Sequence, residues 1–503
     1  MSEEEIFKNE DVKRIVKYSR TLWALGHVSN LMGWDLEVNM PREGIKERSI
    51  ATSELEVLRQ KLLLQKEFLD LVEKAEKNRE SLNDYERGLI RVLKRNIRIA
   101  KALPPELIRE LSKVTSEANM KWRIAKKKND YKIFEPYLER IIELEREVAE
   151  HLGYEEHPYD ALLDLFEEGL KTSDMEKIFK VIEPGIRDVL KRVLDEKLYP
   201  QTHRLEKEKY EVEDMKKLNM EILRLLGYPL GEKARLDVSA HPFTTSMGIK
   251  DVRITTRYLG FDFKRSMFSA IHEFGHALYE LQIDEKLMAT PLATGISLGI
   301  HESQSRFWEN MIGRSKMFAE AIYPTVKKYL KYVEDYSPNE LYLYFNVVKP
   351  SLIRVDADEV TYNLHILLRF KLEKMMIEGE VKVDELPELW NNEMERLLGI
   401  RPKTYSEGIL QDIHWSGGMG YFPTYTIGNI VAAQIRHHAI KEIDLEENMR
   451  KLDFEPLKNY LKEKIHRWGS TYPPKELLKR SFNEELNPKP FIEYINEKYL
   501  SKI

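Results

Sequence analysis

The most informative absence in this chain of 503 residues is cysteine, which does not occur at all. Disulfides, thiolate metal sites and cysteine nucleophiles are therefore excluded, and any metal must be held by His, Asp or Glu. An excess of charge is also lacking, because 80 basic and 85 acidic residues leave a net charge of only −5. The aromatic residues do not alternate with basic ones, so we expect no nucleic-acid partner.

Long uncharged segments are rare as well. The longest one, residues 413–435, contains His414, two adjacent glycines and Pro423, which makes it a poor candidate for a membrane span. The acidic N-terminus has no apolar stretch of the kind found in a secretory signal. We therefore expect a soluble, cytoplasmic protein without a membrane partner.

What the sequence does contain is charge of both signs. Charged residues make up 33% of the chain, against roughly 25% in average soluble proteins. The Lys and Glu enrichment, together with the lack of cysteine, favours a thermostable protein from a thermophile. An ordinary charged helical protein is the alternative explanation.

Periodicity predicts helices over most of the chain, for example at residues 54–74 and 85–101. Capping boxes predict helix starts at Ser173–Glu176 and at Ser337–Glu340. Residues 236–239 and 251–256 alternate as strands do, with a turn or loop between them. The prediction is a mainly α fold with a small β-sheet. The free edge of this sheet could hold an extended peptide, and the alternative is that the strands form only a stabilising hairpin.

A pair of histidines marks the candidate catalytic helix, predicted at residues 263–282 with Asp262 as its N-cap. His272 and His276 are four residues apart, so both imidazoles lie on one helical face and can bind one metal ion. Glu273 directly follows the first histidine and can take a proton from metal-activated water as a general base. The alternative is an ordinary helix in which both histidines have their hydrogen bonds satisfied without a metal.

A catalytic metal site needs a third protein ligand. Glu302 lies 26 residues after His276 at the end of a stretch, residues 287–300, that contains no charged residue. A buried carboxylate without a partner is costly, and metal coordination removes that cost. We predict Glu302 as the third ligand, with a solvated surface glutamate as the alternative.

Six motifs in order make the chain resemble the thermostable metallocarboxypeptidase family called carboxypeptidase Taq, most of all its archaeal, Pyrococcus-type members. Besides the metal-site helix, they are His241-Pro242-Phe243, Asp251-Val252-Arg253-Ile254-Thr255, His301-Glu302-Ser303-Gln304, Ile353-Arg354-Val355-Asp356-Ala357-Asp358 and Gly408-Ile409-Leu410-Gln411-Asp412-Ile413-His414-Trp415.

The resemblance implies metal-dependent release of single C-terminal residues from peptides, with broad specificity. It implies one divalent metal ion per chain, zinc or alternatively cobalt, and a homodimer. It also implies a multi-helix body with a deep active-site groove, similar to neurolysin. Residues 1–503 would form a single domain, with two helical lobes around the groove as an alternative organisation.

The remaining roles follow from the chemistry of an exopeptidase. The substrate's terminal carboxylate needs an arginine fork, for which Arg354 is the first candidate and Arg253 the second. Internal ion pairs with Asp356, Asp358 or Asp251 are the alternative for these arginines. His414 and Tyr425 resemble the oxyanion donors of a related dipeptidase fold, with Tyr421 as a substitute. His241 is predicted either to contact substrate or to close a turn.

Two competing functions share the same metal motif. An oligopeptidase or dipeptidyl carboxypeptidase would use every metal ligand and differ only in where the substrate carboxylate is held. A helical scaffold with a purely structural metal site belongs to a different class. The presence of Glu273 argues against it, because a structural site needs no general base.

Overall fold

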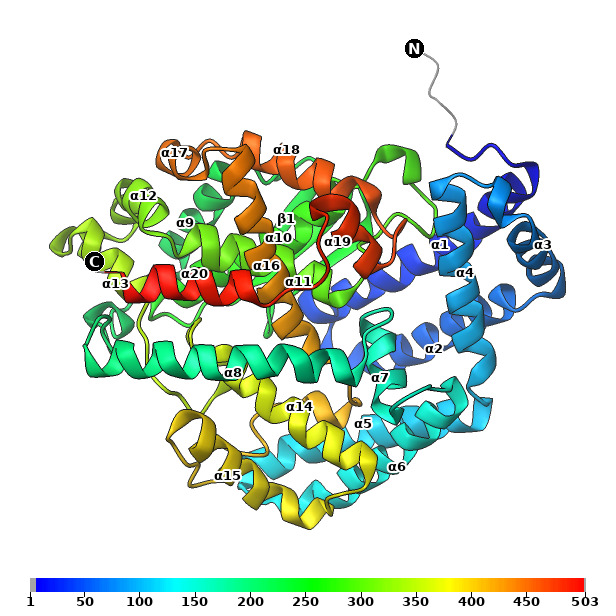
Figure 1. Cartoon of the computed structure of the whole chain (residues 1–503), viewed down its shortest axis with the longest axis horizontal. Coiled ribbons are helices and arrows are strands. Elements are labelled where there is room, and N and C mark those ends of the chain that lie inside the picture. Colours follow the sequence, from blue (N-terminus) through cyan, green and yellow to red (C-terminus); the bar gives the residue numbers. More distant parts are fainter. Residues whose placement is uncertain (1–5, 502–503) are drawn as a thin grey trace. The chain divides into compact units, whose positions relative to one another are not determined.

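The computed structural model describes residues 6–501 and shows a mainly helical protein with one small sheet, which confirms the predicted fold class (Figure 1). The chain divides into two compact units, each built from three separate stretches of sequence. Of the described residues, unit 1 takes 6–101, 204–342 and 435–485, and unit 2 takes the others. The predicted single domain, with two lobes as its alternative, stays a prediction.

Unit 1 contains the predicted metal-site helix and the sheet. Its helices are α1 (Glu10–Val38), α2 (Ile45–Leu63), α3 (Lys66–Lys77), α4 (Asp84–Ala102), α9 (Val212–Leu225), α10 (Phe263–Leu281), α11 (Leu298–Arg306), α12 (Lys316–Tyr329), α13 (Pro338–Phe345), α17 (Leu445–Lys451), α18 (Glu455–Lys464) and α19 (Pro474–Phe482). The last residues of α4 and α13 already belong to unit 2.

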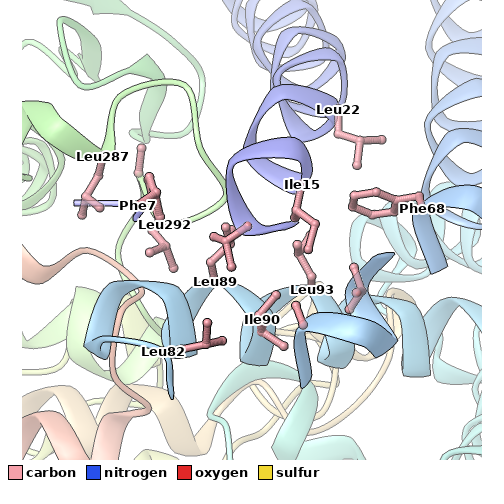
Figure 2. Packing of buried hydrophobic residues seen from close by; sticks show 14 of the residues in the cluster. Phe7, Ile15, Leu22, Phe68, Leu82, Leu89, Ile90, Leu93, Leu287 and Leu292 are labelled. Carbon is pink, nitrogen blue, oxygen red and sulfur yellow. The ribbon is translucent and has the colours of Figure 1, made fainter. Parts of the chain in front are cut away.

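One hydrophobic cluster of unit 1 lies where α1, α3 and α4 meet (Figure 2). Ile15, Phe68, Leu89 and Leu93 pack together there with almost no exposed surface. This packing explains one error in the predicted helices. The expected helix at residues 54–74 is broken at Gln65, whose backbone is extended, so that α3 can turn its apolar face toward the cluster.

The sheet consists of β1 (Ala234–Val238), β2 (Thr244–Gly248) and β3 (Asp251–Thr256) in the spatial order β1-β3-β2. β1 pairs with β3 in parallel, and β2 pairs with β3 in antiparallel fashion with an irregularity between Ser246 and Gly248. The prediction of a loop was wrong for β2. Its sequence, Thr-Thr-Ser-Met-Gly, lacks the alternation of apolar and polar residues that marks a strand, and pairing with β3 is what orders it.

The sheet supports α10 on one face and α1 at one edge. The Thr256 hydroxyl donates a hydrogen bond to the carbonyl of Ser266 in α10 at 3.2 Å. At the outer edge of β2, His27 Nδ1 donates to the Met247 carbonyl at 2.6 Å and Asn30 donates to the Ser246 carbonyl at 2.8 Å. This part of the edge is therefore covered by α1 side chains.

Unit 2 is built around α14. Its helices are α5 (Pro105–Lys128), α6 (Glu135–Leu152), α7 (Pro158–Phe166), α8 (Thr172–Asp195), α14 (Tyr362–Glu378), α15 (Leu386–Leu398), α16 (Pro423–Glu442) and α20 (Lys489–Leu500), with the end of α16 passing into unit 1. α20 lies along α8 (Figure 1). Glu373 of α14 is fully buried and accepts hydrogen bonds from Trp415 Nε1 at 2.7 Å and from the Gly420 backbone at 3.0 Å.

The predicted helix starts have mixed outcomes. The capping box Ser337–Glu340 is confirmed, because each of the two side chains bonds the other residue's backbone N–H. The box at Ser173 is wrong, because α8 already begins at Thr172, before the predicted cap, and the backbone and hydroxyl of Thr172 both donate to Asp160. Among residues 6–501, none of the helices combines the length and apolar character that crossing a bilayer would require.

Candidate active site

The three predicted metal ligands converge in unit 1. One donor atom each from His272, His276 and Glu302 lies within 4.8 Å of the other two. Glu302 Oε2 is 3.6 Å from Nε2 of His272 and 3.4 Å from Nε2 of His276. Ligand atoms about 2.0–2.1 Å from a tetrahedral zinc ion are separated from one another by about 3.3 Å. The two imidazole nitrogens and one carboxylate oxygen therefore fit a divalent metal.

Close packing of α10 on α11 brings Glu302 to the histidines. Gly275 lies between the histidines on α10, and a Cβ atom there would be 2.5 Å from the Gln304 carbonyl oxygen and 2.6 Å from the Ser305 Cα. Any side chain would push the two helices apart. The glycine therefore costs helix propensity but permits the distance between ligands that a metal needs.

The two oxygens of Glu302 have different partners. Arg306, one turn later on α11, donates from Nε to Oε1 at 2.6 Å, and Ser305 donates to Oε2 at 3.1 Å. Burial opposes the charged form of Glu302, but Arg306 and both histidines outweigh burial and hold its pKa well below the usual range. Oε2 is thus an ionised oxygen that faces the imidazoles.

A second carboxylate orients His272. α11 continues directly into a π-helical segment, Phe307–Gly313, a feature often found at functional sites. Glu309 on this segment accepts from His272 Nδ1 at 2.9 Å and from Arg314 at 2.9 Å. The second ring nitrogen of a metal-binding histidine commonly donates to such a carboxylate. Burial favours the neutral form of His276 and lowers its pKa to about 4, so this imidazole is neutral near pH 7.

Glu273 lies beside the ligands with its carboxylate held by a strand residue. The Thr244 hydroxyl of β2 contacts Glu273 twice, at 2.6 Å from Oε2 and at 3.0 Å from the backbone carbonyl. Burial raises the pKa of the Glu273 carboxyl above its ordinary value. A raised carboxyl pKa close to a metal site is a common property of general bases.

In unit 2, Arg354 belongs to a largely buried ionic cluster. Its Nε and NH2 atoms donate to Asp412 Oδ1 at 3.1 and 2.8 Å, and NH1 donates to the Tyr362 hydroxyl at 2.9 Å. Arg369 donates to the other oxygen of Asp412 from Nε at 2.8 Å. Burial opposes the charge of Asp412, but the two guanidinium groups hold its pKa well below the usual range. Two cations thus share one carboxylate.

The predicted oxyanion donors lie beside this cluster. His414 Nε2 is 3.3 Å from the Tyr425 hydroxyl, and its ring centre is 5.6 Å from that of Tyr421. The guanidinium of Arg354 lies 5.1 Å from the centre of the Tyr425 ring. Burial lowers the pKa of His414 to about 4, and the charge of Arg354 adds to this effect. The structure therefore brings four predicted residues together in unit 2.

Arg253 and His241 have other surroundings. Arg253 on β3 makes two hydrogen bonds of 2.8 Å to Asp251 and lies 4.4 Å from the centre of the Trp34 ring. Because side chains alternate along a strand, Arg253 points away from the sheet face that packs on α10. The backbone carbonyl of His241 accepts from the Ser239 hydroxyl at 2.6 Å, and the residue is exposed.

Three residues of this site were missed by the sequence interpretation: Thr244, Arg306 and Glu309. Arg306 and Glu309 follow Glu302 by four and seven residues, so helical spacing alone places them near the same face. That spacing was a usable signal. Thr244 has no such signal, because its contact with Glu273 depends on the unpredicted strand β2.

Comparison with known proteins shows which family this chain is similar to. The family model described as Carboxypeptidase Taq (M32) metallopeptidase matches residues 14–499. Thermostable carboxypeptidase 1 of Pyrococcus furiosus is 60% identical over 499 residues, which cover 99% of this chain and 100% of that protein. Carboxypeptidase 1 of Bacillus subtilis is 37% identical over 491 residues, covering 97% and 96% of the two chains.

A solved structure leads to the same comparison. The structure of Pyrococcus furiosus carboxypeptidase superposes with a TM-score of 0.97 at 60% sequence identity, and the match covers 98% of this chain and 100% of that one. The backbone similarity therefore extends over both units and includes the helices that carry the donor atoms.

Proposed function

Because the chain belongs to the carboxypeptidase Taq (M32) metallopeptidase family, we propose that it releases single C-terminal residues from peptides of varied sequence, using a metal held by His272, His276 and Glu302. The observation that carries this proposal is the convergence of these three donors beside Glu273. Zinc, or alternatively cobalt, would supply Lewis acidity that polarises the peptide carbonyl and activates water.

Glu273 is the general base in this proposal. The Thr244 hydroxyl occupies Oε2 of the carboxylate, which leaves Oε1 to accept a proton from the attacking water. The same oxygen can then return the proton to the amine of the departing residue. A structural metal site would need neither the carboxylate nor a residue that orients it.

Arg354 is the proposed anchor for the terminal carboxylate. A guanidinium has five N–H groups. In Arg354, the hydrogen bonds to side chains among residues 6–501 use one N–H group on each of its three nitrogens. One N–H on NH1 and one on NH2 remain, and together they form the fork that binds a carboxylate with two hydrogen bonds. Arg354 and Arg369 carry two positive charges against the one negative charge of Asp412. The remaining positive charge also favours binding of an anion.

The other predicted residues have supporting roles. His414 and Tyr425 are proposed to donate to the developing oxyanion, with Tyr421 as the substitute. Their mutual contact at 3.3 Å supports a joint role. Arg253 is the alternative anchor for the carboxylate, although its Nε and NH2 atoms donate hydrogen bonds to Asp251. His241 stays a candidate for substrate contact through its imidazole.

Two parts of the proposal concern the whole protein. We propose a homodimer in which each chain has a deep groove and one metal ion, and a cytoplasmic location. The family resemblance supports the homodimer. Light scattering coupled to gel filtration tests the dimer, since a mass of one chain of 59.5 kDa would exclude it.

Product analysis on an N-terminally blocked tripeptide tests the activity itself. We expect one free amino acid and a blocked dipeptide as the first products, and no products after the metal is removed with a chelator. Release of an intact dipeptide would replace this proposal with a dipeptidyl carboxypeptidase. Hydrolysis that persists without any metal would exclude the metal-dependent reaction.

A further inference from the structure

His301 connects a proposed metal ligand to a buried carboxylate. Its Nδ1 atom is 2.9 Å from Nδ1 of His276, and its Nε2 atom is 2.9 Å from Glu280 Oε1. His301 precedes Glu302 on α11, whereas His276 and Glu280 lie one turn apart on α10. The imidazole thus bridges the same two helices that bring the metal donors together.

The surroundings of His301 leave its ring little freedom. A Cβ atom on Gly295 would be 2.5 Å from Cδ2 of His301 and 2.9 Å from its Nε2, so the backbone of the preceding loop lies against the ring. The ring centre of Tyr279 is 5.0 Å from that of His301 on another side. The loop that holds the ring also holds its partner, because the Gly295 backbone N–H donates to Glu280 Oε1 at 2.8 Å.

The hydrogen-bond chain has only one consistent direction if His276 binds the metal as proposed. The Nε2 atom of His276 faces Glu302, so Nε2 is the metal-binding atom and Nδ1 of this neutral ring carries the proton. Two N–H groups cannot point at each other. Nδ1 of His301 is therefore the acceptor, and the proton of His301 is on Nε2.

Glu280 completes this chain as an acceptor. Its Oε1 atom accepts from Nε2 of His301, from the Gly295 backbone and from the Thr294 hydroxyl at 3.3 Å. Three donors directed at Oε1 mean that this oxygen carries no proton, because a protonated oxygen would be a donor itself. The direction of every hydrogen bond is then determined, from His276 to His301 to Glu280.

We propose that His301 is a positioning residue that, as its Nε2–H tautomer, accepts the Nδ1 proton of His276 and so fixes the orientation of this ligand. The proposal rests on the metal site of the proposed function. It also makes the two histidine ligands unequal. His272 donates directly to the carboxylate of Glu309 at 2.9 Å, whereas His276 donates to an imidazole whose own N–H is directed at Glu280.

The orienting role predicts a specific effect on metal binding. Without an acceptor at Nδ1, the ring of His276 can rotate about its Cβ–Cγ bond and leave the metal. Loss of such a partner typically weakens metal binding about ten- to hundredfold. Gly295 and Tyr279 would still pack against a side chain of similar size, so the fold can be separated from the hydrogen bond.

Two substitutions distinguish the hydrogen bond from simple packing. His301→Leu introduces an apolar side chain of moderate size that offers no hydrogen-bond acceptor. His301→Asn offers its amide oxygen near the place of Nδ1. Both proteins are loaded with cobalt(II), and proton NMR follows the shifted, solvent-exchangeable N–H resonances of the coordinated imidazoles. Thermal unfolding monitors whether each variant is folded.

We expect two such resonances in the unsubstituted protein, one from His272 and one from His276. In His301→Leu, one resonance should exchange with water at least about tenfold faster and the dissociation constant for cobalt should rise about ten- to hundredfold. His301→Asn should restore slow exchange. Glu309→Gln serves as the matched control, because it changes the acceptor of His272 and none of the hydrogen bonds from His276 to His301 and Glu280, so the His276 resonance should stay in place.

A measurement without substitution makes the test independent of folding. Nitrogen-15 NMR of the zinc-loaded protein with labelled histidine should find His301 neutral, with its proton on Nε2. A proton on Nδ1, or slow exchange of both resonances in His301→Leu, would overturn the inference while the metal site stands. Absence of any coordinated imidazole resonance in the unsubstituted protein would overturn the metal site itself, and the inference with it.

Discussion

Arg306 holds one oxygen of Glu302 and leaves the other to face the histidines. Its Nε atom donates to Oε1 at 2.6 Å, whereas Oε2 lies 3.6 and 3.4 Å from the Nε2 atoms of His272 and His276. A carboxylate arranged in this way would offer one oxygen to a metal ion. Arg306 also neutralises the carboxylate when no metal is bound, so the site can be formed before the metal arrives.

Replacing Arg306 with methionine should therefore destabilise the metal-free protein more than the metal-loaded one. Removing one partner of a buried ion pair typically costs about 3–5 kcal/mol, because the other charge is left uncompensated. A divalent ion at Glu302 would replace the lost positive charge. Denaturant unfolding with zinc and with chelator measures both free energies of unfolding, and equal losses in the two conditions would contradict this role.

Arg450→Met is the control for that experiment. Arg450 pairs with Glu446 one turn earlier on α17, and both side chains are more than half exposed. Water and salt screen such a surface pair, so its removal should leave the free energy of unfolding nearly unchanged with or without zinc. The comparison separates the buried pair at the site from the general effect of losing an arginine.

Glu273→Gln tests the general base. The glutamine keeps the shape of the side chain but cannot accept a proton, so kcat should fall by about a hundred- to ten-thousandfold. Metal content should stay at one ion per chain, because Glu273 is not a proposed ligand. A fully active glutamine variant, or one that has lost its metal, would contradict the assignment.

Thr244 should act through Glu273. Thr244→Val removes the hydroxyl that donates to Oε2 at 2.6 Å and keeps the volume of the side chain. A hydrogen bond to a charged group is worth about 1.5–3 kcal/mol, which corresponds to roughly ten- to hundredfold in rate. We expect kcat to fall by that factor with KM and zinc content unchanged, and Thr244→Ser to recover most of it. A valine variant as active as the serine variant would contradict this role.

Gly275→Ala should separate α10 from α11. Its Cβ would meet the backbone of Gln304 and Ser305 at 2.5–2.6 Å, and backbone atoms cannot move aside as a flexible side chain can. We expect a loss of about 1–3 kcal/mol or more in the free energy of unfolding and weaker zinc binding. Gly33→Ala on α1 is the control, because nothing lies within 4 Å of its added methyl group. Equal stability of the two variants would refute the packing argument.

The metal ligands could be predicted from the sequence because their geometry is local. His272 and His276 are four residues apart on one helix, and helical spacing alone places both rings on the same face. Glu302 could be predicted because its carboxylate follows residues 287–300, a stretch without charged residues. Spacing from Glu302 could have placed Glu309 near the site, but the partners of Glu309 and Glu280 could not be predicted, because each pair joins α10 to a segment packed against it.

The fold shows the same division between local and long-range determinants. The helix α4 was predicted to within one residue at each end, because its apolar face repeats with helical period over its whole length. The break between α2 and α3 was missed because residues 54–74 keep that period across it. Strand β2 was missed because its pairing with β3 gives it order that Thr244–Gly248 do not have by themselves.

Arg354 gives a prediction about the substrate. If its guanidinium binds the terminal carboxylate, amidating the C-terminus of a peptide should reduce kcat/KM steeply, since burying an unpaired charge costs several kcal/mol. Arg354→Lys should also weaken cleavage of the free acid, because an ammonium group cannot form a planar fork. Equal hydrolysis of the acid and the amide by the unsubstituted enzyme would exclude a carboxypeptidase.

Arg354→Ala then identifies the anchor. Asp412 keeps a partner in this variant, because Arg369 also donates to it. The variant should therefore fold, and it should cleave the free acid and the amide at similar low rates. If it discriminates as well as the unsubstituted enzyme, the anchor lies elsewhere, and the same pair of peptides should be measured on Arg253→Ala.

The most direct test of the account is the amount of metal bound when its carboxylate ligand is removed. The unsubstituted protein and Glu302→Ala are loaded with zinc, dialysed against metal-free buffer and analysed for zinc per chain by elemental mass spectrometry. We predict one zinc ion per chain in the unsubstituted protein and a large loss of zinc in the variant, because two imidazoles alone bind the ion weakly. Retention of one zinc ion per chain by Glu302→Ala would contradict the proposed metal site.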